Sequence, residues 1–600
     1  MSVTPPSALA QLFQSEGWRA RSRRLRPLSL PGGALLFETG GAPDEVFFLN
    51  SGRLGVTRHE AGGSQFLGVV RPGEIVGEMA AISGAAHTAT VTALRDSELW
   101  AMPRDVFLAI ARREPKVTME LAHLMLERSR KGVSPSIGDP NVIGLVGVSR
   151  GVRVRALAET LALALAAIGR KAVVLGVEAQ ERSSAWFSQC ENDHDLVLLA
   201  AEVDEPAWRD VCARQCDRLF LVGSAAQRVR DASKAFGLEP LRRHKLVDLL
   251  LMRPASQSAP ARGQAWRDAV RPNQLFHYRE TDAADAARLA RVIAGRSVAL
   301  VLSGGGARAF AQLGAVQALR QAGMPIDFVG GTSMGAVVAA GLALGWDDQM
   351  LQARVREAFV NTNPLDDIAF PMLALTQGRK VKERLAQHFG DVEIADLPLP
   401  FFCVSADLTA GAPYVHERGV LRDALRASVA LPGLLPPVIL DNRVLVDGAV
   451  AKNYPADLMR ERRPGTLVGV DVTRAKGLTV DEVRRPPFWP WVFSGAWRQG
   501  PPIVSVLMRS ATIMTARDVE ASRLASDFYV APNVDGVEIR DWKAFAPAMQ
   551  AGERAALTAL ADANDEMRQR LGLAPRVDAP SAPDEPLDLG LLAIAVAAQP

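Results

Sequence analysis

The pentapeptide Gly331-Thr332-Ser333-Met334-Gly335, with the residues on either side of it, is the feature that most constrains how this chain can fold. Ile326–Gly330 has the apolar composition of a short strand, and Ala336–Leu344 is small and apolar, as in a packed helix. A G-x-S-x-G sequence between a strand and a helix is typical of a nucleophile elbow, whose glycines permit a tight turn that exposes the serine hydroxyl. The pattern predicts that Ser333 is a nucleophile.

A glycine-rich loop precedes the elbow. Val298–Leu302 is typical of a buried strand and leads into Ser303-Gly304-Gly305-Gly306-Ala307-Arg308. Backbone N–H groups in such a loop can stabilise a developing oxyanion. A strand, a glycine loop and Asp327 about twenty residues on also imitate a dinucleotide-binding fingerprint, but the elbow directly after Asp327 leaves that strand no room to serve a ribose. Loop and elbow predict a serine esterase; a dinucleotide site and an inert α/β core of tight turns are the alternatives.

Composition and charge narrow the class of protein. The 600 residues exceed one core and indicate several domains, and 48% hydrophobic with 22% charged residues is ordinary globular material. A formal net charge of +3 gives no strong field, so we expect no nucleic-acid partner. Four cysteines without paired-motif spacing indicate a reducing compartment, no disulfide framework and no metal site. No signal peptide is evident, and we expect a cytoplasmic protein without a membrane-spanning helix.

The pattern along the chain divides it into segments. Glycine turns spaced by roughly 8–12 residues predict a small β-barrel with helices near the N-terminus, and alternating strands and helices predict parallel sheets further on. We predict a multidomain α/β protein. Its segments are an N-terminal extension (1–26), the barrel (27–132), a linker (133–141), a degenerate Rossmann- or P-loop-like α/β domain (142–294), the esterase domain (295–475), its helical and Trp-rich continuation (476–574) and a flexible tail (575–600).

Two further motifs complete a recognisable set. Asp447-Gly448-Ala449 follows the strand-like Val444–Val446 and would present a carboxylate at a tight turn, and Ala427–Pro437 is a small-residue helix end leading into a Pro/Gly loop. With the glycine loop and the elbow, in this order, they make residues 296–472 resemble the patatin-like phospholipases. Within that family the chain is most similar to bacterial relatives of neuropathy target esterase, which cleave phospholipids and lysophospholipids.

The resemblance implies a Ser–Asp dyad without histidine. Ser333 would attack the ester carbonyl to form an acyl-enzyme, and Asp447 would accept its proton. The oxyanion would be held by the loop residues Gly304, Gly305, Gly306 and Arg308. The motif residues that shape the turns are Gly331, Gly335, Gly448 and Ala449.

Two points of this assignment stay open from the sequence. Ala309 stands where the family's oxyanion motif often has glycine, which matters little unless that position needs positive φ. A Ser-His-Asp triad using His388 or His416 is the alternative to the dyad, and a lone carboxylate is a poor base unless burial raises its pKa. The expected partner is a phospholipid or lysophospholipid substrate, with no cofactor required. A lipid-binding or cyclic-nucleotide-responsive regulatory protein is the alternative function.

Residues 27–130 resemble a cyclic-nucleotide-binding domain. The strongest carrier is Gly77-Glu78-Met79-Ala80, leading to Thr88-Ala89-Thr90-Val91. The resemblance implies that Glu78 would hold the ribose and that an arginine should hold the cyclic phosphate, but His87 occupies that position. Imidazole lacks the permanently charged, bidentate grip of a guanidinium. A cyclic nucleotide is therefore a doubtful ligand: the site Gly77, Glu78, His87 and Thr88 either binds it weakly or belongs to a module that has lost it.

The middle segment and a Trp-rich stretch have weaker signals. Asn141–Val152 lies where a phosphate loop could follow a first strand but lacks the Gly-Lys-Ser/Thr that would hold phosphate and magnesium. It resembles a decayed P-loop domain of the same family, and we expect a scaffold. Arg484–Trp497 combines tryptophans with arginines, as suits peripheral contact with a membrane, or is a loop packed on the esterase core. The basic run Arg19–Arg24 could also touch anionic lipid or be a solvated face.

Overall fold

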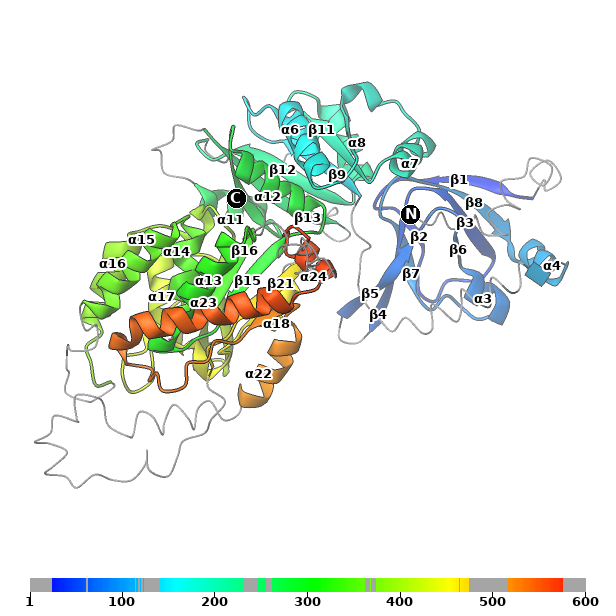
Figure 1. Cartoon of the computed structure of the whole chain (residues 1–600). Coiled ribbons are helices and arrows are strands. Elements are labelled where there is room, and N and C mark those ends of the chain that lie inside the picture. Colours follow the sequence, from blue (N-terminus) through cyan, green and yellow to red (C-terminus); the bar gives the residue numbers. More distant parts are fainter. Residues whose placement is uncertain are drawn as a thin grey trace, which may run out of the picture.

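The computed structural model describes residues 24–60, 63–113, 141–227, 245–254, 262–361, 374–462, 465–473 and 515–575, with a few single residues between them. Three domains follow one another: a barrel, a middle domain and a C-terminal domain, with the middle domain between the other two (Figure 1). The predicted multidomain α/β fold class is confirmed. The Trp-rich stretch 484–497, the basic run 19–23 and the tail beyond 575 lie outside the described residues.

The N-terminal barrel consists of two four-stranded antiparallel sheets, with strand orders β1-β8-β3-β6 and β2-β7-β4-β5. Alternate residues of the strands fill its interior, where Phe47, Leu49 and Leu99 are buried. The elements are β1 (Arg26–Leu30), β2 (Leu35–Phe37), β3 (Glu45–Ser51), β4 (Leu54–Glu60), β5 (Gly63–Val70), β6 (Ile75–Val76), α3 (Glu78–Ser83), β7 (Thr90–Ala93), β8 (Ser97–Pro103) and α4 (Arg104–Arg113).

The middle domain is a six-stranded parallel sheet in the order β10-β11-β9-β12-β13-β14. Its strands are β9 (Val142–Gly147), β10 (Ala172–Leu175), β11 (Leu196–Ala201), β12 (Arg218–Ser224), β13 (Leu246–Arg253) and β14 (Leu275–Arg279). Helices α6 (Val154–Ala167) and α12 (Ala283–Ile293) cover one face, and α7 (Ser184–Asp193), α8 (Pro206–Gln215) and α11 (Gly263–Val270) cover the other. Because both faces are covered, the strands are almost continuously apolar.

The C-terminal domain has an eight-stranded mixed sheet in the order β19-β20-β17-β16-β15-β21-β22, with β18 paired to β17. The pairs β15–β16, β16–β17, β15–β21 and β21–β22 are parallel, and those of β17 with β18 and β20, and of β19 with β20, are antiparallel. The strands are β15 (Val298–Leu302), β16 (Phe328–Thr332), β17 (Phe401–Asp407), β18 (Ala412–His416), β19 (Val438–Leu440), β20 (Arg443–Asp447), β21 (Thr466–Val470) and β22 (Phe528–Val530).

Helices pack on both sides of this sheet (Figure 1). They are α13 (Phe310–Gln321), α14 (Met334–Ala343), α15 (Asp348–Val355), α16 (Arg379–Phe389), α17 (Leu421–Ser428), α18 (Ala456–Arg462), α22 (Thr515–Leu524), α23 (Phe545–Asp562) and α24 (Asp565–Arg570). α13 and α23 touch backbone to backbone, because a Cβ at Gly552 would lie 1.7 Å from the carbonyl oxygen of Ala311. Among the described residues no helix is long and apolar enough to cross a membrane.

The middle and C-terminal domains share one hydrophobic cluster. Phe276 on β14 meets Phe328 on β16 edge to face, with ring centroids 6.0 Å apart. Beside them, Arg291 on α12 forms an ion pair of 2.7 Å with Asp327, which also accepts a hydrogen bond from the backbone N–H of Val298. Asp327 thus secures the starts of β15 and β16, and its side chain is taken up by protein groups rather than available to a ribose.

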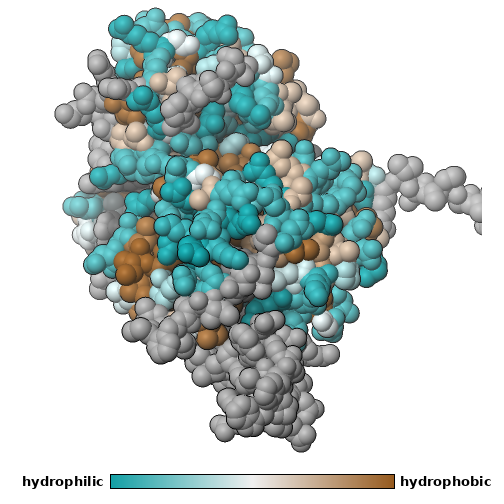
Figure 2. Space-filling model, turned by 90° about the vertical axis from the view of Figure 1, so that its left-hand side faces the viewer, coloured by the Kyte–Doolittle hydropathy of each residue, from teal (hydrophilic) through white to brown (hydrophobic). Residues whose placement is uncertain are grey.

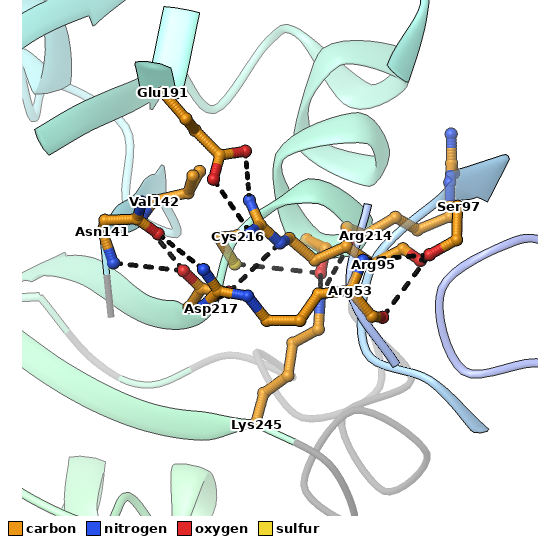
Figure 3. A network of polar contacts seen from close by, with 11 residues as sticks. Arg53, Arg95, Ser97, Asn141, Val142, Glu191, Arg214, Cys216, Asp217 and Lys245 are labelled. Atoms are coloured by element: carbon orange, nitrogen blue, oxygen red, sulfur yellow. Dashed lines mark hydrogen bonds and ion pairs between the residues drawn. The ribbon is translucent and has the colours of Figure 1, made fainter. Parts of the chain in front are cut away.

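A buried polar network joins the barrel to the middle domain (Figure 3). The carboxylate of Asp217, before β12, forms ion pairs with Arg53 at 2.9 Å and Arg95 at 3.2 Å, both from turns of the barrel. Its other oxygen accepts hydrogen bonds from the backbone N–H groups of Asn141 and Val142. Burial opposes the charge of Arg95, but Asp217 and its second partner Glu191 outweigh it and raise the pKa of this guanidinium. A single carboxylate therefore holds two buried cations at the interface.

We expect Asp217→Asn to destabilise the chain by about 3 kcal/mol or more, because removing one member of a buried ion pair leaves its partners desolvated and uncompensated. The measurement is the urea midpoint of the first unfolding transition of the full chain. Asp105→Asn is the matched control, because the ion pair of Asp105 with Arg24 is solvent-exposed, and it should leave the midpoint nearly unchanged. Equal midpoints for Asp217→Asn and wild type would contradict this account.

Candidate active site

Ser333 lies at a strained turn between β16 and α14. Its φ of 54° and ψ of −128° are rare for a residue with a side chain. The turn requires glycine on both sides: a Cβ at Gly331 would lie 2.8 Å from the backbone of Gly335, and one at Gly335 would lie 2.4 Å from the carbonyl oxygen of Ser303. The strand, turn and helix arrangement predicted for the elbow is the one found, with the strand two residues further along than its sequence pattern indicated.

Asp447 faces Ser333 from the end of β20. The Ser333 hydroxyl donates to Asp447 Oδ2 at 2.6 Å, and the backbone N–H of Ala449 donates to Oδ1 at 2.8 Å. Asp447 is fully buried, and this burial raises the pKa of its carboxyl to about 7, although both hydrogen bonds favour the ionised form. Gly448 lets the turn lie against β17, because a Cβ there would be 2.3 Å from the carbonyl oxygen of Val404.

A second serine fixes the backbone of the elbow. The N–H of Ser333 donates to Ser428 Oγ at 2.9 Å, and Ser428 Oγ donates to the carbonyl oxygen of Val404 at 2.6 Å. Ser428 ends α17 and is fully buried. Sequence reasoning identified the stretch around it but assigned no role to this residue, because its two partners lie far away in the chain.

The glycine loop after β15 is anchored at its first glycine. The N–H of Gly304 donates to the carbonyl oxygen of Asn453 at 3.0 Å, and Asn453 Nδ2 donates back to the carbonyl oxygen of Gly304 at 3.2 Å. Within the described residues, the N–H groups of Gly305 and Gly306 donate to no protein acceptor. Gly304 therefore holds the loop in place, and the next two glycines have N–H groups available to a ligand.

A strap, defined as residues 533–542, covers the outside of this loop. Arg308 Nε donates to the carbonyl oxygen of Val537 at 2.8 Å. The backbone N–H of Ala307 donates to the carbonyl oxygen of Ile539, also at 2.8 Å. Trp542 packs edge to face on Phe310, with centroids 6.0 Å apart. The guanidinium of Arg308 is thus tied to the strap. No sequence motif marked the strap, because its contacts to the loop use backbone carbonyls.

An apolar cavity lies beside Ser333, with about 830 Å³ of empty space when its opening to solvent is included. Gly306, Ser333 and Ile539 line the cavity near the start of α14. Trp346 and Phe389 also line it, and Trp346 follows the last residues of that helix. The remaining lining residues are Met334, Val337, Arg354, Val355, Ala358, Phe359, Val381, Arg384, Leu385, His388, Val429, Leu431, Leu435, Arg540 and Trp542. A predominantly apolar cavity with few polar groups suits a hydrocarbon chain. The face of the molecule seen in Figure 2 is largely hydrophilic, with separate hydrophobic patches.

The two histidines proposed for a triad are placed elsewhere. His416 on β18 forms a 2.8 Å hydrogen bond with Ser405 Oγ, and burial lowers its pKa to about 4. His388 on α16 lines the cavity, and burial lowers its pKa as well. In the part of the chain that the structure describes, neither hydrogen-bonds Ser333 or Asp447, and no cluster of residues is suited to a metal ion.

Protein side chains pack against one another at the cyclic-nucleotide-like site of the barrel. The His87 imidazole stacks on Phe37 with ring centroids 3.9 Å apart, and it lies close to Gly77, where a Cβ would be 3.5 Å from the ring. Glu78 is buried at the start of α3, and Thr88 follows His87 on the surface. Burial lowers the pKa of His87, so the ring is not a permanent cation for a phosphate.

The phosphate-loop position of the middle domain is also occupied from within. At the start of α6, the N–H groups of Val154 and Arg155 donate to the two carboxylate oxygens of Glu202, at 3.1 and 3.0 Å. In P-loop proteins the N–H groups at this helix end bind phosphate. Glu202 here supplies the negative charge that a nucleotide would bring.

Comparisons with known proteins cover most of the chain. A family model of patatin-like phospholipase matches residues 300–460, one of the cyclic nucleotide-binding domain matches 27–114, and one of the neuropathy target esterase (NTE) family P-loop-like domain matches 140–279. Among solved structures, the catabolite activator protein of Thermus thermophilus is similar to 18% of this chain, with 31% identity, 51% of its own chain covered and a TM-score of 0.17.

Curated proteins are similar to this chain over most of its length. An uncharacterized NTE family protein of Mycobacterium tuberculosis is 31% identical over 90% of this chain and 92% of its own length. The human patatin-like phospholipase domain-containing protein 6 is 29% identical over 74% of this chain and 37% of its own. The resemblance found in the sequence motifs is confirmed: the chain belongs to the neuropathy target esterase family and is a lipid ester hydrolase.

Proposed function

We propose that the chain cleaves carboxylic esters of phospholipids or lysophospholipids through a dyad of Ser333 and Asp447, releasing a fatty acid. The observation that supports this most directly is the 2.6 Å hydrogen bond from Ser333 Oγ to a fully buried carboxylate beside an apolar cavity. A base within hydrogen-bond reach of the nucleophile is the first requirement for proton transfer. A protein that only binds lipid would have no use for a strained serine held against a carboxylate.

In the proposed reaction, the ionised Asp447 accepts the hydroxyl proton as Ser333 Oγ bonds to the ester carbonyl carbon. The N–H groups of Gly305 and Gly306, joined by that of Met334 at the start of α14, stabilise the negative oxygen. The intermediate collapses, the alcohol leaves with the proton from Asp447, and the acyl group stays on Ser333. Water then repeats the sequence with Asp447 as base, which releases the fatty acid and restores the enzyme.

The residues around this centre contribute by position. Gly304 and Arg308, which the family resemblance places at the oxyanion, anchor the loop through Asn453 and the strap rather than pointing free donors at the substrate. The apolar cavity takes the acyl chain. No cofactor takes part in this reaction. Peripheral contact with a membrane through residues 484–497 stays a prediction.

We also propose that the barrel acts without a bound cyclic nucleotide. The ring of His87 fills the place where a cyclic phosphate would lie, and its stacking on Phe37 would be lost if a nucleotide displaced it. The middle domain serves as a scaffold on the same grounds, since Glu202 satisfies the N–H groups of α6. Both domains then support the C-terminal domain structurally.

Ser333→Ala and Asp447→Asn are each expected to lower fatty-acid release from lysophosphatidylcholine by at least about 10³-fold, because they remove the nucleophile and its base. The measurement is titration of released fatty acid with purified full chain. His416→Gln, which keeps a hydrogen-bonding group for Ser405, should retain most activity. A loss with His416→Gln as large as with Asp447→Asn would favour a triad instead.

The raised pKa of Asp447 predicts opposite effects of pH on activity and stability. Only the ionised base accepts a proton, so kcat/KM should rise with pH through about 7 and then level off. Between about pH 4 and 7 the native state keeps a proton on Asp447 that the unfolded chain has lost, so this group's contribution to stability falls as pH rises, by roughly 4 kcal/mol in all. Asp447→Asn should therefore be more stable than wild type at pH 8 in urea unfolding, and the difference should shrink at pH 5.

For fluorescent analogues of cyclic AMP or cyclic GMP, we expect the barrel to have a Kd in the millimolar range or weaker, as measured by fluorescence anisotropy. His87→Arg, which introduces the bidentate cation, is expected to strengthen binding by roughly tenfold or more. Micromolar binding by wild type that Glu78→Ala abolishes would show that the barrel is a working nucleotide sensor.

A further inference from the structure

Arg540 is a cation at the active-site cavity that no described residue holds in a hydrogen bond or ion pair. It belongs to the strap and lines the cavity together with Ser333 and Gly306. Within the described residues its guanidinium makes no hydrogen bond or ion pair, although the side chain is half-buried. Burial lowers its pKa, and the charge of nearby Glu538 opposes that effect only in part. A cation in such surroundings is best stabilised by an anion that arrives with the ligand.

The other arginines of the cavity, unlike Arg540, have hydrogen-bond acceptors in the protein. Arg354 donates to the carbonyl oxygen of His388 at 3.1 Å and lies over the ring of Trp346. Arg384 donates to the side-chain oxygen of Gln387 at 2.7 Å. Both side chains thus have protein partners, and Arg354 lies at Trp346, beyond the end of α14.

The position of Arg540 is fixed at the Ser333 end of the cavity. The carbonyl oxygen of its neighbour Ile539 accepts a hydrogen bond from the N–H of Ala307 in the glycine loop. The carbonyl oxygen of Arg540 accepts one from the N–H of Trp542 at 3.0 Å. The backbone on both sides is thus tied down, and the Arg540 side chain lines the same cavity as Gly306 and Ser333. With the acyl chain in the apolar part of the cavity and the ester at Ser333, the polar end of the substrate lies on this side.

We propose that Arg540 binds the phosphate of the lipid substrate and makes the enzyme prefer phospholipids and lysophospholipids to uncharged acylglycerols. A guanidinium can hold two phosphate oxygens at once, and the phosphate is common to lipids with different head groups. The inference rests on the proposed esterase function and names the part of the substrate that the site selects. Recognition of the phosphate alone means that lysophosphatidylcholine and lysophosphatidic acid depend on Arg540 to a similar degree.

The test compares wild type, Arg540→Gln and Arg540→Lys on three substrates with the same acyl chain: lysophosphatidylcholine, lysophosphatidic acid and monoacylglycerol. Arg540→Gln is expected to lose roughly 10- to 100-fold more kcat/KM on each phosphate-bearing lipid than on monoacylglycerol, mainly through KM. Arg540→Lys keeps the positive charge but not the two-pronged geometry of the guanidinium, so its activity on the phosphate-bearing lipids should lie between those of wild type and Arg540→Gln. Lys543→Gln is the control, since this exposed residue of the next turn does not line the cavity, and it should not change the substrate preference.

The outcomes separate the two proposals. If wild type hydrolyses none of the three esters, the esterase proposal fails. If wild type is active but Arg540→Gln loses activity equally on all three, Arg540 only supports the strap and the phosphate inference is overturned. Dependence on Arg540 for lysophosphatidylcholine and not for lysophosphatidic acid would overturn it too, because the residue would then respond to the whole head group.

Discussion

The hydrogen bond between Ser333 and Asp447 is the interaction on which the proposed chemistry of the C-terminal domain depends. Its two residues are 114 positions apart in the chain and meet at 2.6 Å. They come together because β17 pairs with β16 on one side and with β20 on the other, which brings the ends of β16 and β20 to one edge of the sheet. The strained backbone of Ser333 persists because Ser428 and the close glycine contacts leave it no relaxed alternative.

The sequence was sufficient to predict the parts of the site that local geometry determines. The strand Val298–Leu302 was predicted at its observed bounds, and the elbow followed from the spacing of two glycines around a serine. Asn453, Ser428 and the strap were not predicted as site residues, because they act through backbone groups distant in sequence. Backbone carbonyls carry no signature in the side-chain pattern, so residues 533–542 resemble any polar loop. Only the folded chain shows that they cover the glycine loop.

The barrel and the middle domain have the same relation to their families' ligands. In each, a protein side chain lies at the motif that the family resemblance assigns to phosphate: His87 stacks on Phe37 in the barrel, and Glu202 accepts the N–H groups at the start of α6. The protein side chain is always present at the site, so a ligand that binds there must first displace it. The net free energy of binding is reduced by the contacts that are lost. The two sequence motifs lack an arginine and a Gly-Lys-Ser/Thr, but they did not show which side chains would contact the remaining groups.

Two domains without an evident ligand still have a physical connection to Ser333. Asp217 binds the barrel to the middle domain, and Arg291 of the middle domain binds Asp327 at the start of β16. The five residues of β16 then lead directly to Ser333, with Phe328 packed against the middle domain's Phe276. A packed core moves between discrete arrangements rather than deforming gradually, so a shift of α12 would displace a strand whose far end is the nucleophile. These contacts between the middle domain and β16 support the scaffold role proposed for that domain.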